Sequence, residues 1–187
     1  MLSDEEIERL LAQRSISNTF PWADESPSVV ESFYKGVCSG ADRKLGTKSR
    51  VEWNHYGSGY ASFVDAWFYK STDGFFFEYP GKFGEAYHGL AVLLCRLAPY
   101  FVLLQGEKTW AERGGSSYMP TFECIDEFKT PAVSSLAIEM QDVLEGYGLV
   151  RLKKEDLAKR IDPKFQVFTN LSDRPYTEFD ALFYWED

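Results

Sequence analysis

Apolar residues recur at helical spacing in three segments of the chain. In the first segment, Ser3 and Glu6 form a capping-box pattern ahead of the apolar positions. The second segment begins at Ser26-Pro27 and the third at Thr130-Pro131, where a polar cap followed by proline favours the first turn of a helix. The sequence therefore predicts a helical N-terminal segment over about residues 1–40 and a further helix in the second half of the chain.

Two aromatic-rich runs in the middle of the chain have the spacing of strands. In an extended conformation, the run Tyr60–Lys70 has mostly apolar residues on both of its faces, which predicts a central strand covered on two sides. The connection to Phe75–Tyr79 ends in Asp73-Gly74, a strong signal for a β-hairpin between the runs. Asp65 is the polar exception within the first strand, and a buried carboxylate needs a partner or a shifted pKa.

The most apolar stretch is Glu85–Ala98, followed by Pro99. Its length and composition favour a buried helix, on which Glu85, His88 and Arg96 fall along one polar stripe. Arg96 and Pro99 interrupt the stretch of residues that would be needed to cross a membrane, so no membrane association is expected.

The remaining segments complete an α+β pattern. Strands are expected at Tyr100–Leu104, extending toward Trp110, at Tyr118–Ile125 and at Tyr176–Trp185, whereas the polar residues 40–50 read as a loop. Helices and strands mix without a regular βαβ alternation. We therefore expect one α+β domain over residues 1–187, in which helices pack on a mostly antiparallel central sheet of about five to seven strands.

Charge and cysteine content narrow the function classes. The formal net charge is −9, which disfavours binding to nucleic acid and favours a protein partner with a basic surface. The same acidity is also typical of ordinary soluble proteins. Three widely spaced cysteines, Cys38, Cys95 and Cys124, form neither a disulfide framework nor a metal-binding pair. With no signal-peptide pattern at the N-terminus, a cytoplasmic location fits best.

Catalytic and cofactor motifs are missing from the sequence. His55 and His88 are the only histidines, and no serine lies in a GxSxG turn. Gly106-Glu107-Lys108-Thr109 resembles the end of a phosphate-binding loop but lacks its first glycine, where Phe101 stands. We therefore expect no cofactor and no metal, and the sequence favours a non-catalytic function.

Two functions remain open at this point. The first is a protein-binding domain, of which an immunity protein that neutralises a bacterial toxin by binding it is an example, because an acidic domain without a catalytic motif is typical of that class. Its candidate contact residues are acidic residues, which are usually exposed, and tryptophans: Trp22, Asp24, Glu25, Trp110, Glu112, Trp185, Glu186 and Asp187. The alternative is a small enzyme or ligand-binding domain whose pocket near Asp65 and His88 would be lined by His55, Asp65, Glu85, His88 and Arg96.

Overall fold

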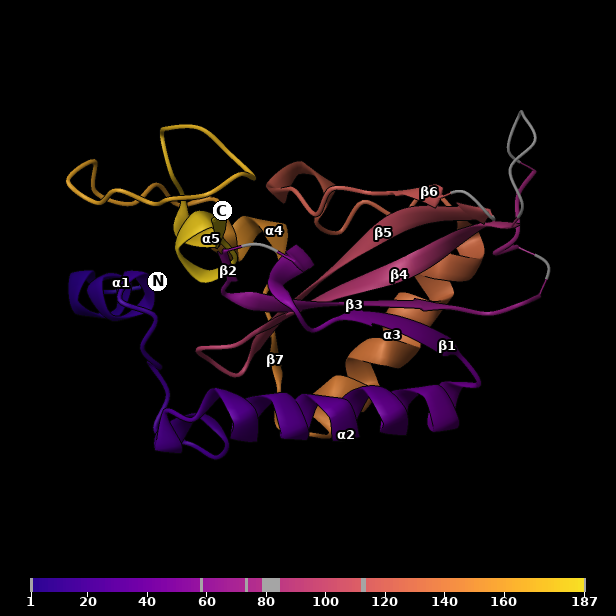
Figure 1. Ribbon diagram of the computed structural model, residues 1–187, viewed down its shortest axis with the longest axis horizontal. Helices are drawn as coiled ribbons and strands as arrows, with labels where there is room; N and C mark the ends of the chain where they lie inside the picture. The colour runs from indigo at the N-terminus through magenta and orange to yellow at the C-terminus, as the bar shows by residue number, and fades with distance from the viewer. Residues whose placement is uncertain (1, 58, 73, 79–84, 112–113, 187) are drawn as a thin grey trace.

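A curled antiparallel sheet forms the centre of the computed structural model, which describes residues 2–57, 59–72, 74–78, 85–111 and 114–186 (Figure 1). Its strand order is β1-β3-β4-β5-β6, and β7 pairs with β5 in parallel while the other neighbours are antiparallel. The strands are β1 (Lys48–Glu52), β3 (Phe63–Tyr69), β4 (Glu85–Cys95), β5 (Tyr100–Ala111), β6 (Gly114–Ser117) and β7 (Val150–Arg151). The expected α+β class with an antiparallel sheet is thus confirmed.

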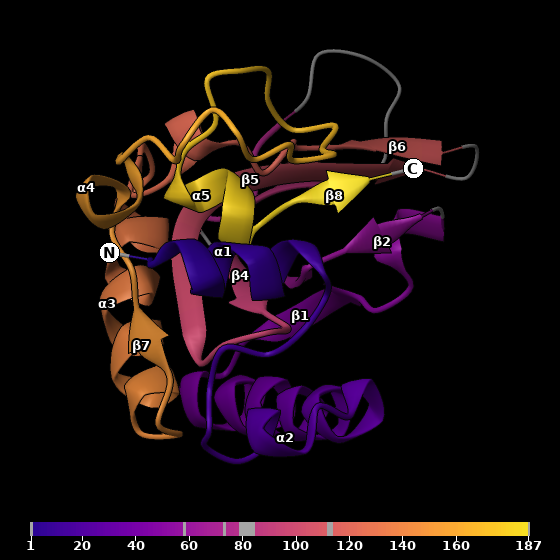
Figure 2. The same ribbon diagram turned by 90° about the vertical axis from the view of Figure 1, so that its left-hand side faces the viewer.

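Helices cover the sheet, and a second small sheet lies at one end of it. In Figure 1, α2 and α3 lie below the sheet, whereas α1 and α5 lie toward its left-hand end. There β2 pairs with β8, as the turned view also shows (Figure 2). The bounds are α1 (Asp4–Leu11), α2 (Pro27–Leu45), α3 (Pro131–Glu145), α4 (Lys154–Leu157), α5 (Glu178–Leu182), β2 (Tyr60–Ala61) and β8 (Trp185–Glu186). None of the helices in the described part of the chain has the length and apolar character to cross a membrane.

The helix starts follow their sequence signals, but the end of α2 does not. Ser3 and Glu6 form the capping box of α1, and proline opens both α2 and α3. The expectation of a loop over residues 40–50 is wrong at both ends, because α2 continues to Leu45 and β1 begins at Lys48. Gly40 lies inside this helix where the Tyr147 hydroxyl approaches, and an added Cβ would be 2.1 Å from that oxygen. Close packing, and not helix termination, explains the glycine.

The prediction of a helix over Glu85–Ala98 is wrong, because this segment forms strand β4. It pairs with β3 on one edge and β5 on the other, and both of its faces are buried along most of its length. A strand covered on both faces is apolar at every position, so its sequence has no period that separates it from a buried helix. The expected polar stripe does not form either, since Glu85 and His88 are three positions apart and face opposite sides of a strand.

The expected hairpin between the two aromatic runs is also wrong. Strand β3 pairs with β4 from Phe63↔Cys95 to Phe68↔Leu90, and residues 75–77 continue along the same strand. The amide of His88 donates to the Phe75 carbonyl at 2.8 Å, and the amide of Phe77 donates to the Ala86 carbonyl at 3.1 Å. The two runs therefore lie end to end beside β4, because the long β4 strand offers an edge to both.

Two later strand predictions fail for local reasons. Residues 118–125 hold only a short 3-10 helix at Phe122–Cys124 and a single bridge from Ile125 to Leu104. The segment 176–185 is mainly helix α5, because the Thr177 amide and hydroxyl both donate to Asp180 Oδ2, at 2.6 and 3.0 Å, and form a capping box. The T-x-x-D pattern was the signal for this helix.

The aromatic residues mostly belong to the core. The largest fully buried side chains include Trp67, Tyr34, Phe63, Phe68, Phe101, Phe179 and Phe183. The Trp67 ring lies against Gly89, where an added Cβ would come within 2.3 Å of the ring.

Candidate functional site

A pocket of about 250 Å³ lies where α2 begins and β4 ends. We call it the α2 pocket. Its apolar wall consists of Trp22, Pro27, Val30, Tyr60 and Leu97. Its polar groups are Gln13, Ser15, Glu25, Ser26, Glu31, His55 and Arg96. Residues from four parts of the sequence thus meet here, and four of them were candidates from sequence: Trp22 and Glu25 as contact residues, His55 and Arg96 as pocket residues.

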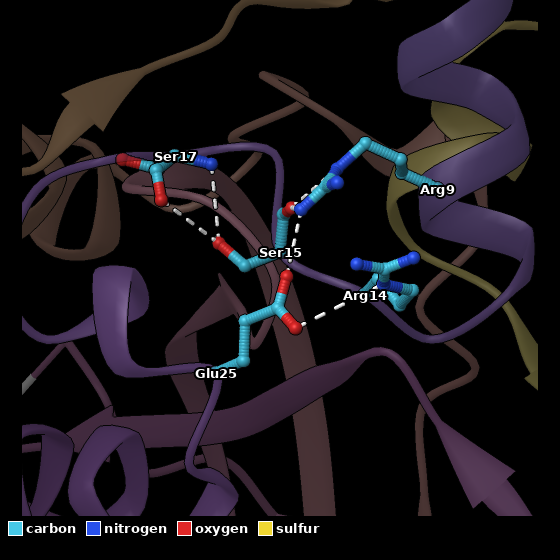
Figure 3. Close-up of polar contacts among 5 residues, drawn as sticks. All are labelled: Arg9, Arg14, Ser15, Ser17 and Glu25. Atoms are coloured by element: carbon cyan, nitrogen blue, oxygen red, sulfur yellow. Dashed lines mark hydrogen bonds and ion pairs between the residues drawn. The ribbon is translucent and has the colours of Figure 1, made fainter.

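Glu25 lies on the pocket rim between two arginines (Figure 3). Its Oε1 is 2.7 Å from Arg9 Nη2, and its Oε2 is 3.8 Å from Arg14 Nε. Arg9 also donates from Nε and Nη2 to the Ser15 carbonyl, at 2.9 and 2.6 Å. These contacts tie the segment that precedes α2 to α1, and they neutralise the charge of Glu25 at the rim.

Glu31 is the second carboxylate of the pocket, and it also has a partner within the chain. Its Oε1 is 2.6 Å from Lys35 Nζ, one turn further along α2. The helix begins at Pro27 with Ser26 as its N-cap, and the Ser26 side chain makes no capping hydrogen bond. The positive end of the α2 dipole therefore lies at the pocket.

His55 contributes a neutral imidazole to the pocket. The Ala61 amide donates to its Nδ1 at 2.9 Å, and the ring stacks on Tyr60 with centroids 5.3 Å apart. Burial, and then the nearby Arg96 cation, lowers the pKa of His55 below its usual value. Nδ1 also lies 3.2 Å from the Ala61 carbonyl, but its shorter contact is with the amide, which can only donate, so we assign Nδ1 as the acceptor and place the hydrogen on Nε2.

Arg96 is the only residue of the pocket whose charge has no ion-pair partner among the described residues. Its Nε donates to the Phe63 carbonyl at 3.2 Å, and its Nη2 donates to the Trp53 carbonyl at 2.9 Å. Burial lowers the pKa of this guanidinium, which stays charged nevertheless. Two backbone carbonyls therefore orient a half-buried cation at the pocket.

The other candidate contact residues lie partly beside the pocket and partly far from it. Asp24 is exposed next to Glu25, and Glu186 accepts a hydrogen bond from Gln13 Nε2 at 3.3 Å. Trp185 packs on Tyr56, with centroids 4.7 Å apart. Trp110 lies near the other end of β5, under the Arg50 guanidinium. Glu112 and Asp187 lie outside the described residues. Trp22 is only 2% exposed, so it forms the pocket wall and is not a surface contact.

Asp65 forms a separate buried cluster with residues that the sequence did not single out. Its Oδ2 accepts from the Tyr56 hydroxyl at 2.9 Å, and its Oδ1 accepts a short hydrogen bond from the Tyr118 hydroxyl. Burial raises the pKa of the Asp65 carboxyl, and the hydrogen bond from Tyr118 opposes that rise. Lys108 lies over the Tyr118 ring at 4.9 Å, and burial lowers its pKa. We call these four residues (Tyr56, Asp65, Lys108 and Tyr118) the Asp65 cluster.

His88 and Glu85 join neither of these sites. His88 stacks on Phe77 with centroids 4.3 Å apart, and its Nδ1 is 3.1 Å from Glu107 Oε1. Glu85 is exposed at the start of β4. Asp65 is paired with Leu93 on β4, five positions from His88, so Asp65 and His88 face opposite sides of the sheet. The structure therefore does not bring the five candidate pocket residues together.

Metal binding has no support in the described part of the chain, where no group of three or more histidine, cysteine or acidic side chains could hold an ion. Tyr60, Val30 and Leu97 were not predicted as pocket residues, since each has an ordinary apolar environment in the sequence. Comparison of the chain with protein-family models, with curated proteins and with solved structures finds no match.

Proposed function

We propose that this protein is a non-catalytic recognition domain that binds another protein at the α2 pocket. The observation that carries this proposal is the pocket itself: an apolar wall around an oriented guanidinium and a neutral imidazole. A concave apolar site with a few convergent polar groups is the usual form of a binding site. Its volume of about 250 Å³ lies below the range of roughly 300–1,000 Å³ for sites that enclose drug-sized ligands, which favours insertion of one side chain or chain end.

Exposed aromatic surface beside the pocket supports a protein partner. Phe20 is 68% exposed, and its ring meets Phe33 edge to face with centroids 6.1 Å apart. Phe33 in turn contacts the pocket residue Trp22 at 5.8 Å. Aromatic residues that flank a desolvated pocket are typical of interface hot spots.

The overall charge of −9 favours a partner with a basic surface, because it steers such a partner toward this chain. A toxin-neutralising immunity protein would work in this way, by occupying a basic active site of the toxin. Cytoplasmic location is part of the proposal, and the free thiols of Cys38, Cys95 and Cys124 are consistent with a reducing compartment.

The test is to fill the pocket and measure complex formation. Tagged wild-type chain and the variant Ser26→Trp are purified from the cells of origin, and the composition of each complex is determined by native mass spectrometry. Ser26 lines the pocket and its side chain makes no capping hydrogen bond, so the substitution blocks the pocket at little cost to α2. We expect a stoichiometric partner with the wild type and its loss with Ser26→Trp.

Ser135→Trp provides the matched control, since Ser135 is exposed on α3 and outside the pocket. This variant should retain the partner. Recovery of no stoichiometric partner, or equal recovery with Ser26→Trp and Ser135→Trp, would contradict the proposed function.

The alternative of a small enzyme or ligand-binding domain near Asp65 and His88 has less support. These two residues face opposite sides of the sheet, and the Asp65 carboxylate is enclosed by two tyrosine hydroxyls of this chain. An acid–base pair needs both groups within hydrogen-bond reach of one substrate.

A further inference from the structure

Two hydrogen-bond donors of the α2 pocket have no acceptor among the described residues. The Arg96 guanidinium uses Nε and Nη2 to bind the Phe63 and Trp53 carbonyls, which leaves Nη1 without a hydrogen bond. His55 accepts the Ala61 amide at Nδ1, so its hydrogen lies on Nε2, on the far side of the ring. Both residues line the pocket.

Neither carboxylate at the same pocket forms a contact ion pair with Arg96 among the described residues, although Glu31 is near enough to favour its charged form. Glu25 is held by Arg9 and Arg14, as Figure 3 shows, and Glu31 is held by Lys35. A half-buried cation whose charge is not matched by contact is costly unless something else supplies the negative charge. The positive end of the 19-residue helix α2 adds to the same local field. Arg96 and the start of α2 are therefore the groups of the pocket that attract an anion, although the chain as a whole is acidic.

The remaining surface of the pocket is apolar. Trp22 and Val30 are 2% and 4% exposed, and Leu97 is 7% exposed, so a ligand would bury itself against well-packed side chains. A cation would be repelled by Arg96. A dianion such as a phosphate group would meet only one guanidinium without an ion-pair partner in the pocket, which matches one of its two charges. A singly charged anion on an apolar body matches the pocket best.

We propose that the α2 pocket binds a carboxylate carried on an apolar group, and specifically the C-terminal residue of the partner chain. Arg96 Nη1 and His55 Nε2 donate to the carboxylate, and the apolar side chain beside it lies against Trp22, Val30 and Leu97. A C-terminal apolar residue combines both features in one small unit, whereas an aspartate or glutamate side chain has little apolar surface. This inference rests on the proposed function, since it names the part of the partner that enters the pocket.

Binding of four probes to the purified full chain tests the inference. They are N-acetyl-phenylalanine, its amide, and a six-residue peptide ending in phenylalanine with a free or an amidated C-terminus, each titrated by calorimetry. We expect each free acid to bind about tenfold or more tightly than its amide, because hydrogen bonds to a charged group are stronger than neutral ones. The free-acid peptide should also bind more tightly than N-acetyl-phenylalanine.

Substitution of the donor gives a second measurement. Arg96→Lys keeps the charge but removes the planar fork of donors, so it should weaken binding of the free-acid peptide by about tenfold and leave the amidated peptide nearly unchanged. Arg43→Lys is the matched control, because Arg43 is exposed near the end of α2 and outside the pocket. It should bind all four probes as the wild type does.

Three outcomes would overturn the inference. Equal affinity for acid and amide would show that the carboxylate is not recognised, and the absence of binding by all four probes at millimolar concentration would show that the pocket does not take this chemistry. Equal affinity for N-acetyl-phenylalanine and the free-acid peptide would assign the pocket to a free small carboxylate and not to a chain end. If Ser26→Trp abolishes the partner complex while acid and amide bind equally, the proposed function stands and this inference alone fails.

Discussion

The α2 pocket and the Asp65 cluster are both polar sites in an aromatic-rich chain, but they differ in how far their hydrogen bonds are completed. In the cluster, both carboxylate oxygens of Asp65 accept a tyrosine hydroxyl, and Lys108 donates to Ser117 at 2.9 Å. In the pocket, Arg96 and His55 each retain a donor that has no acceptor in the part of the chain that the structure describes. A completed network mainly stabilises the fold, whereas an incomplete one can stabilise a complex.

Removal of the Asp65 carboxylate should have the largest effect. Asp65→Ala leaves two largely buried hydroxyls without acceptors, and each unpaired group costs about 1–3 kcal/mol, so we expect a loss of about 2–6 kcal/mol in the free energy of unfolding. Asp65→Asn should lose less, because its amide oxygen still accepts one hydroxyl. Urea denaturation measures both, with Asp24→Ala as the exposed control. A loss below about 1 kcal/mol for Asp65→Ala would show that the cluster is not structural.

The pH dependence of stability should reveal the charge of Asp65. Burial raises the pKa of Asp65 in the folded state above its unfolded value of 3.8, so the unfolded chain releases the proton first as pH rises. The wild type should therefore lose stability relative to Asp65→Asn as the pH rises from about 4 through the folded-state pKa. Denaturation of both proteins between pH 4 and pH 7 gives this difference. A constant difference across the range contradicts the raised pKa.

Substitution at Arg96 should cost less stability than substitution at Asp65. Arg96→Lys loses one of two hydrogen bonds to backbone carbonyls beside an open pocket, where water can replace the lost donor. We expect a decrease of about 1 kcal/mol in the free energy of unfolding. A decrease as large as that of Asp65→Ala would mean that Arg96 is held for the fold and not for a ligand.

The smallest effect is expected at His55, where we predict only the direction in which stability changes with pH. Because burial and Arg96 lower the folded-state pKa of His55, the unfolded chain takes up a proton first as pH falls below 6.5. The wild type should lose stability on acidification through this range relative to His55→Asn, which has no titrating group. Asparagine offers an acceptor for the Ala61 amide and tolerates the φ of 54° found at this position. If the wild type instead becomes more stable relative to His55→Asn as pH falls, the assignment of a neutral ring is contradicted.

Local signals in the sequence predicted the starts of three helices. A capping box located the start of α1 and proline located the starts of α2 and α3, because both signals act within one helical turn. The same type of signal was present at Thr177 and Asp180 but was outweighed by the aromatic run beside it, which reads as a strand. Strand β4 failed for a different reason: burial on both faces is a property of its neighbours, and its own residues carry no period that reports it.

Only part of the candidate site could be anticipated. Trp22 and Glu25 were selected as surface contacts, while His55 and Arg96 were selected as pocket residues, and no sequence pattern indicated that the four meet. Their convergence depends on β4 being a strand that ends at Cys95, which places Arg96 beside the start of α2. The hydrogen bond between Asp65 and Tyr118 could not be predicted from the sequence either, because Tyr118 lies 53 positions away in the chain.

Ser62, next to the strand that carries the pocket residue Tyr60, is bound to residues that are synthesised much later. Its hydroxyl lies 2.9 Å from the Leu182 carbonyl and accepts from the Tyr184 amide, while its carbonyl accepts from the Arg96 amide at 2.7 Å. Tyr184 is translated 122 positions after Ser62. A ribosome-bound nascent chain that still lacks residues 182–186 therefore lacks the pairing of β2 with β8 and the hydrogen bond from Tyr184 to Ser62, although His55 and Arg96 already contact this segment. The wall that Tyr60 provides can be fully fixed only after these residues have left the exit tunnel.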